Sequence, residues 1–117
     1  MNQYIQMLVY VVEQLKKEKA TVHVRVKNLV SVPKAQLERI NVDDESGTIT
    51  LWLNDEIRIS LETEKINRVR FDAIIAEPKT IEDFKNALET LRDDTPYNIY
   101  FCNGGSFYFD IIEVHEI

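Results

Sequence analysis

Residues 37–61, LERINVDDESGTITLWLNDEIRISL, alternate apolar and polar side chains and are interrupted by two polar clusters. Such alternation predicts antiparallel strands with one buried face. Because directly opposed residues lie on the same side of a sheet, the apolar sets must face one another across each turn. This condition predicts two hairpins with loops at residues 44–47 and 54–56. Gly47 would supply the left-handed residue that four-residue loops often need.

The same register predicts an outward face. Trp52 would lie between Arg39 on one neighbouring strand and Arg58 on the other, all pointing away from the core. A guanidinium over an indole ring contributes about 0.5–2 kcal/mol. Such a surface suits a protein partner, or single-stranded nucleic acid through stacking. The competing interpretation is that a helix covers Trp52 and the arginines only make the sheet soluble.

The segments before this region predict a helix and a strand. Residues 2–19 carry apolar side chains at helical spacing and end in lysines, which favour a helix C-terminus. Residues 20–28 alternate valines with polar residues and predict a strand. Residues 29–34 contain Pro33 and predict a connection or an edge strand. The basic residues of 20–28, and those of residues 68–70, would extend the Trp52 surface if their strands adjoin it.

The segments after it predict one more strand of the meander and a second helix. Apolar residues recur with strand spacing, and Ile66 is out of phase with them, which predicts an irregularity near Asn67. Thr80 predicts the N-cap of a helix over residues 80–93. The apolar residues of the fourth strand are Val69, Phe71, Ala73 and Ile75.

The chain closes with a predicted β-hairpin. A three-residue loop at residues 103–105 would place all apolar residues of both strands on one side. The outer side would carry Cys102 half-exposed, together with Tyr100 and Tyr108, which form a second candidate surface. The residues predicted on the inner side are Tyr97, Ile99, Phe101, Phe107, Phe109 and Ile111.

Together these elements predict a single α+β domain over residues 1–117. It would contain an antiparallel β-meander, an N-terminal helix, a second helix near residues 80–93 and a C-terminal β-hairpin. The hydrophobic pattern of residues 37–75 resembles that of small barrel modules such as Sm-like and OB-like domains. That resemblance implies a coiled or barrel-like meander as an alternative to an open sheet, and periodicity leaves both open.

The charge is distributed unevenly along the chain. The net charge of the whole chain is −6, but residues 1–70 carry +1 and residues 71–117 carry −7. The acidic part disfavours non-specific binding of nucleic acid or anionic membranes there. The single cysteine excludes an internal disulfide, and the apolar runs are too short to span a bilayer. We therefore expect a cytoplasmic protein without a membrane partner.

No motif predicts a catalytic, cofactor or metal site. Cys102 has no base nearby, because His23 and His115 are both distant in sequence. Glu113 and His115 would provide only two of the ligands that a metal site requires. The glycines of residues 103–106 lack the lysine and following helix of a phosphate-binding loop.

We therefore expect a small non-catalytic interaction or regulatory protein that binds a protein partner, or itself, through a sheet face or edge. One alternative is binding of nucleic acid or an anionic ligand by the Arg/Trp face. Another is a small-ligand or enzymatic pocket between the helices and the sheet. The candidate surface residues are Arg39, Trp52, Arg58, Tyr100 and Tyr108.

Overall fold

A computed structural model of the chain describes residues 2–72, 77–92, 97–103 and 110–116. Helices and antiparallel strands follow one another as an α+β domain, which confirms the predicted class. The elements are α1 (Gln3–Glu18), β1 (Val22–Val26), β2 (Val30–Ala35), β3 (Leu37–Asp43), β4 (Thr48–Leu53), β5 (Ile57–Glu62), the 3₁₀ helix η1 (Thr63–Lys65), β6 (Arg68–Phe71), α2 (Ile81–Arg92), β7 (Asn98–Cys102) and β8 (Asp110–Glu116).

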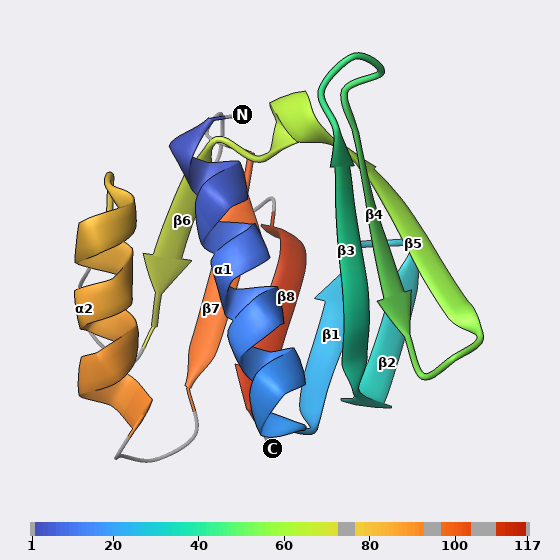
Figure 1. Cartoon of the computed structure of the whole chain (residues 1–117), viewed down its shortest axis with the longest axis horizontal. Coiled ribbons are helices and arrows are strands. Elements are labelled where there is room, and N and C mark those ends of the chain that lie inside the picture. Colours follow the sequence, from blue (N-terminus) through green and yellow to red (C-terminus); the bar gives the residue numbers. More distant parts are fainter. Residues whose placement is uncertain (1, 73–76, 93–96, 104–109, 117) are drawn as a thin grey trace.

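The described strands form two open sheets rather than a closed barrel (Figure 1). One sheet has five strands in the order β2-β1-β8-β7-β6, and the other has three in the order β3-β4-β5. β2, which the sequence predicted as a connection or an edge, is an edge strand and carries Pro33. An edge is where proline is tolerated, because its missing N–H breaks no ladder between two neighbours.

The three-stranded sheet has the predicted register. Val42 lies opposite Ile49, and Leu53 lies opposite Ile57, so both hairpin loops have the expected lengths. Gly47 has a φ of 68°, the left-handed conformation that a side chain would disfavour. Asparagine tolerates the same region, and Asn54 adopts it in the second loop with a φ of 50°.

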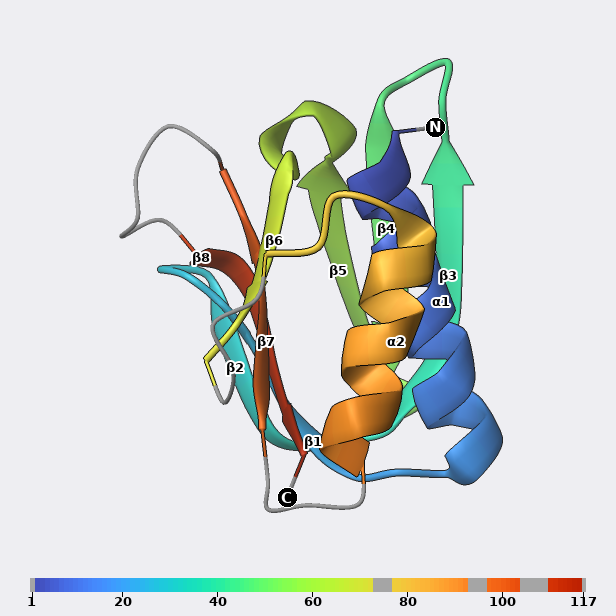
Figure 2. The same cartoon turned by 90° about the vertical axis from the view of Figure 1, so that its left-hand side faces the viewer.

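Helix α1 forms the centre of the core. Asn2 caps it by accepting a hydrogen bond from the Ile5 N–H at 2.9 Å, and it ends at the left-handed Lys19. The helix packs against β3 and α2, and both helices lie on the same side of the five-stranded sheet (Figure 2). Its buried residues are Ile5, Met7, Leu8, Val11, Val12 and Leu15.

Helix α2 closes the other end of the core. The Thr80 hydroxyl accepts a hydrogen bond from the Asp83 N–H at 3.1 Å, as expected for an N-cap. Phe84 is fully buried, and its ring lies 5.6 Å from that of Phe71 and 6.4 Å from that of Phe101. The second predicted helix is therefore confirmed.

The prediction of a fourth meander strand was wrong. β6 pairs with β7 in the five-stranded sheet and not with β5. The chain leaves the three-stranded sheet through η1, and the out-of-phase Ile66 is fully buried at this corner. The irregularity expected near Asn67 therefore marks a change of sheet. Two residues assigned to this strand, Ala73 and Ile75, lie outside the described residues.

The register predicted for the C-terminal hairpin was also wrong. Phe101 lies opposite Ile112, and Ile99 lies opposite Val114, with a shift between Phe101 and Cys102. Ile112 and Val114 supply the buried positions that the prediction had assigned to residues 107 and 109, which lie outside the described residues. Two apolar sets of opposite phase compete for these positions, and the short-loop preference selected the wrong one.

Candidate functional site

The outward side of the three-stranded sheet carries three transverse rows of polar and aromatic side chains. The register shows which residues form each row. The residues between them along β4 and β5 are buried or partly buried, so the rows lie on the outward side. We call these nine residues the Trp52 face. The rows are Arg39–Trp52–Arg58, Asn41–Thr50–Ser60 and Asp43–Thr48–Glu62.

The first row brings together the three residues that the sequence predicted as neighbours. The Arg39 guanidinium carbon lies 4.1 Å from the centroid of the Trp52 ring, within cation–π range. Trp52 is half-buried, whereas Arg39 and Arg58 are exposed. Neither arginine forms an ion pair with any residue that the structure describes. The row therefore combines an accessible aromatic ring with two cations that form no ion pair with the described residues.

The face has opposite charges at its two ends. Two arginines occupy the first row, and Asp43 and Glu62 occupy the third, four residues further along the strands. At roughly 3.4 Å per residue, the two ends lie about 14 Å apart. Asp43 accepts a hydrogen bond from the Glu45 N–H at 3.1 Å, and Glu62 lies 3.6 Å from the exposed Lys65 ammonium.

A second polar face lies on the five-stranded sheet. One row runs across all five strands through Ser31, Arg25, Glu113, Tyr100 and Arg70. The basic residues of β1 and β6 thus gather here and do not extend the Trp52 face. We expected them to extend the Trp52 face only if β1 and β6 adjoined its strands. These two strands belong to the other sheet.

The second face is held together by its own contacts. Glu113 is only 4% exposed and forms an ion pair with Arg25. His115 places Nε2 2.5 Å from Glu113 Oε1 without the geometry of a hydrogen bond. The His115 ring stacks on that of His23 at 5.0 Å, and the His23 Nε2 lies 2.8 Å from the Ser31 hydroxyl. These contacts link β2, β1 and β8 and are typical of a structural network.

Tyr100 also belongs to this network. The Arg70 guanidinium carbon lies 4.4 Å from the centroid of the Tyr100 ring. The Tyr100 hydroxyl donates to Asp72 at 3.4 Å, and Asn98 donates to the same carboxylate at 2.5 Å. Tyr108 lies outside the described residues, so the expected Tyr100/Tyr108 surface stays a prediction. The Glu113–Tyr100–Arg70 row was not predicted, because the register expected for the C-terminal hairpin places other residues opposite Tyr100.

The structure also describes the single cysteine of the chain and the side chains of the types that bind metal ions. Cys102 is 3% exposed, so the expectation of a half-exposed thiol was wrong. Cys102 lies at the register shift between β7 and β8, and its side chain is buried there. Residues 2–72, 77–92, 97–103 and 110–116 contain no group of three or more His, Cys, Asp or Glu side chains placed to hold a metal ion.

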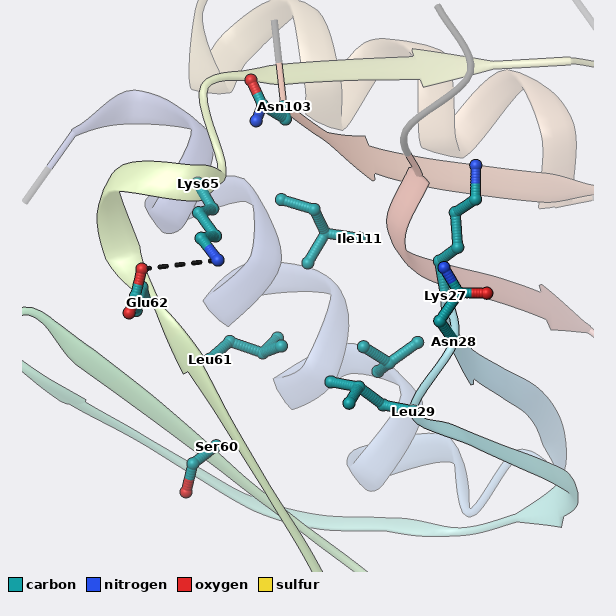
Figure 3. Close-up of a pocket in the computed structure, with 10 residues that line it drawn as sticks. Lys27, Asn28, Leu29, Ser60, Leu61, Glu62, Lys65, Asn103 and Ile111 are labelled. Carbon is teal, nitrogen blue, oxygen red and sulfur yellow. Dashed lines mark ion pairs between the residues drawn. The ribbon is translucent and has the colours of Figure 1, made fainter. Parts of the chain in front are cut away.

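A pocket of about 340 Å³ opens between the two sheets (Figure 3). Leu61 and Leu29 point toward each other across it, and Ile111 reaches in from β8. Its polar lining side chains are all exposed, and the 73% exposed Leu29 forms part of its wall. This position differs from the one expected between helices and sheet.

Comparison with models of known protein families, with curated proteins and with solved structures found no match to this chain. Among the described residues, neither helix has the length and apolar character needed to cross a bilayer.

Proposed function

We propose that this chain is a non-catalytic interaction protein whose Trp52 face binds a protein partner. The Arg39–Trp52–Arg58 row carries this proposal. Tryptophan and arginine are the residues most enriched at the energetic centres of protein interfaces. Here they adjoin on an accessible sheet surface, and Arg58 lacks an ion pair within the described chain. The second face, in contrast, already uses Arg25 to hold Glu113.

The charge pattern favours a protein over a nucleic acid. A nucleic-acid backbone presents negative charge continuously, and its affinity comes mainly from cations placed along its path. On the Trp52 face, Asp43 and Glu62 lie about 14 Å beyond the arginines, and the next turn adds Asp44 and Glu45. A phosphate chain following the strands would meet these four carboxylates. A protein surface can instead present both charges in matching positions.

The proposal is tested by capture followed by a direct measurement. The tagged full chain is used to recover interacting proteins from the cells that express it, and each recovered protein is purified and titrated against the chain. Trp52→Ala and Arg58→Glu should each weaken binding about tenfold or more, the effect of losing a central interface contact. Lys34→Glu reverses an exposed charge on β2 and serves as the matched control.

Two results would contradict the proposal. One is that every purified partner binds the Trp52→Ala and Arg58→Glu variants as tightly as it binds the wild-type chain. The other comes from fluorescence anisotropy with single-stranded DNA and RNA at low salt. If the oligonucleotides bind and the same two variants abolish that binding, the Trp52 face recognises nucleic acid.

A further inference from the structure

We infer that the partner on the Trp52 face is a second copy of this chain, packed face to face with its strands antiparallel to those of the first. The inference rests on the proposed function, because it uses the same nine residues. It adds the identity of the occupant and the geometry of the contact. The observation behind it is the order of the three rows: basic, neutral and acidic.

A two-fold axis makes such a face complementary to itself. Consider an axis that lies between the three-stranded sheets of the two copies. It runs parallel to the planes of these sheets and perpendicular to their strands. It reverses the strand direction but keeps β3 over β3 and β5 over β5. The first row of each copy then lies over the third row of the other. A two-fold interface requires this reciprocity, in which residue i contacts j and j contacts i.

The pairs that this operation creates are chemically matched. Arg39 faces Asp43 of the second copy, and Arg58 faces Glu62 of the second copy. Thr50, the central residue of the central strand, faces itself across the axis. Each of the two charge pairs occurs twice, so four opposite-charge pairs surround a neutral centre. A partner of uniform charge would satisfy one end of the face and be repelled by the other.

The contacts within one copy leave these charges available. The Glu62–Lys65 pair joins two exposed side chains at 3.6 Å, and such pairs contribute little. Asp43 accepts hydrogen bonds from two turn N–H groups, Glu45 and Ser46, and these satisfy one carboxylate oxygen. Arg58 forms no ion pair with any described residue. Pairing with a second copy therefore breaks no strong internal contact.

The contact should be reversible and sensitive to salt. Three short strands offer well under the area of about 800 Å² per partner that is typical of stable complexes. Its attraction comes largely from exposed charges, which salt screens over a Debye length of about 10 Å at 0.1 M. We expect a dimer at low ionic strength and a shift toward monomer at high ionic strength.

Charge exchange at one pair of positions tests the inference. Sedimentation equilibrium of the purified full chain is measured at low and high salt for the wild type, Arg58→Glu and Glu62→Lys. Each variant alone places like charges together twice and should weaken self-association about tenfold or more. An equimolar mixture of the two variants restores opposite charges at both contacts and should return to the wild-type dimer fraction. Neither substitution removes a turn-capping group, and circular dichroism checks that both fold.

Three outcomes would overturn the inference: a wild-type chain that stays monomeric at low salt, a dimer that neither variant weakens, or variants that weaken the dimer but do not restore it when mixed. Lys34→Glu should leave the dimer unchanged. These results use only the purified chain, so they are separate from the capture of other proteins. A monomeric chain that binds another protein through Trp52 would reject self-pairing and keep the proposed function.

Discussion

At the scale of single residues, the contact between Arg39 and Trp52 distinguishes the Trp52 face from an ordinary solvated sheet. Arg39 stacks on the indole, whereas Arg58, on the other side of the ring, makes no cation–π contact with any described residue. The two arginines therefore provide an internal comparison. Arg39 is held against the ring, whereas Arg58 is exposed beside it.

This asymmetry predicts the result of a double-mutant cycle. Alanine substitutions of Arg39 and Trp52, alone and together, should give a coupling of about 0.5–1 kcal/mol in the free energy of unfolding, as expected for an exposed cation–π pair. The matched cycle for Arg58 and Trp52 should give a coupling near zero. Chemical denaturation measures both. A coupling near zero for Arg39 and Trp52 would show that Arg39 does not stack on the indole in solution.

At the scale of elements, the β4–β5 turn is fixed to the junction between β2 and β3. The side-chain Nδ2 of Asn54 donates to the Lys34 carbonyl at 3.0 Å, and the side-chain Oδ1 accepts from the Gln36 N–H at 2.8 Å. The turn follows directly after Trp52 and Leu53. These two hydrogen bonds therefore help to set the position of the first row of the Trp52 face.

Two substitutions separate the roles of Asn54. Asn54→Gly removes the side-chain hydrogen bonds but tolerates the left-handed backbone, and it should lower the free energy of unfolding by about 1–2 kcal/mol. Asn54→Ala adds the cost of a left-handed alanine, about 1 kcal/mol more. Urea denaturation would contradict this account if the alanine variant were as stable as the glycine variant.

An ion pair connects β6 to the segment that leads into α2. The Arg68 guanidinium donates to the Glu77 carboxylate, and this hydrogen bond lowers the pKa of Glu77 and raises the pKa of Arg68. A carboxyl whose pKa is lowered by folding stabilises the fold above its usual pKa, near 4.5 for Glu77. That contribution is lost as the pH falls through the lowered value.

The pH dependence of a Glu77→Gln variant follows from this sign. Near neutral pH the variant should be less stable than the wild type by up to about 1 kcal/mol, because the Glu77 side chain is about half-exposed and solvent screens the pair. The difference should shrink below pH 4.5 and vanish once Glu77 is protonated in the wild type. Thermal unfolding across pH, with the exposed Glu64→Gln as control, measures it. A constant difference at all pH values would contradict the role of the charge.

The sequence predicted those contacts that short loops determine. Polar clusters at residues 44–47 and 54–56 left one register in which the apolar sets meet, and this register also placed Trp52 beside its two arginines. Periodicity shows which side of a strand is buried, but it does not show which strand lies beside it. The partner of β6 therefore could not be predicted, nor could the row that joins Glu113 to Tyr100.

At the scale of the whole molecule, α1 packs on one side of the five-stranded sheet and against β3 of the other sheet (Figure 1). Each sheet turns its apolar side toward this core and its polar side outward. The molecule consequently has two polar sheet faces of different character. One is held by internal ion pairs and stacking, and the other has accessible charges of both signs.

The central position of α1 predicts a large effect of shortening one of its buried side chains. Leu8 is fully buried, and Leu8→Ala should lower the free energy of unfolding by about 2–5 kcal/mol. Gln6 is exposed on the same helix, and Gln6→Ala should change it by less than about 0.5 kcal/mol. Similar losses for the two variants in chemical denaturation would place α1 outside the core.

Trp52 is the single tryptophan of the chain, so its fluorescence reports directly on the Trp52 face. The decisive measurement is acrylamide quenching of this emission in the free chain and in its complex. The free chain is measured at high salt. The complex is either the chain with a purified protein partner or the chain's own dimer at low salt. The account predicts efficient quenching in the free chain and clear protection in the complex. Equal quenching in both states would show that the partner binds elsewhere and would contradict the central claim.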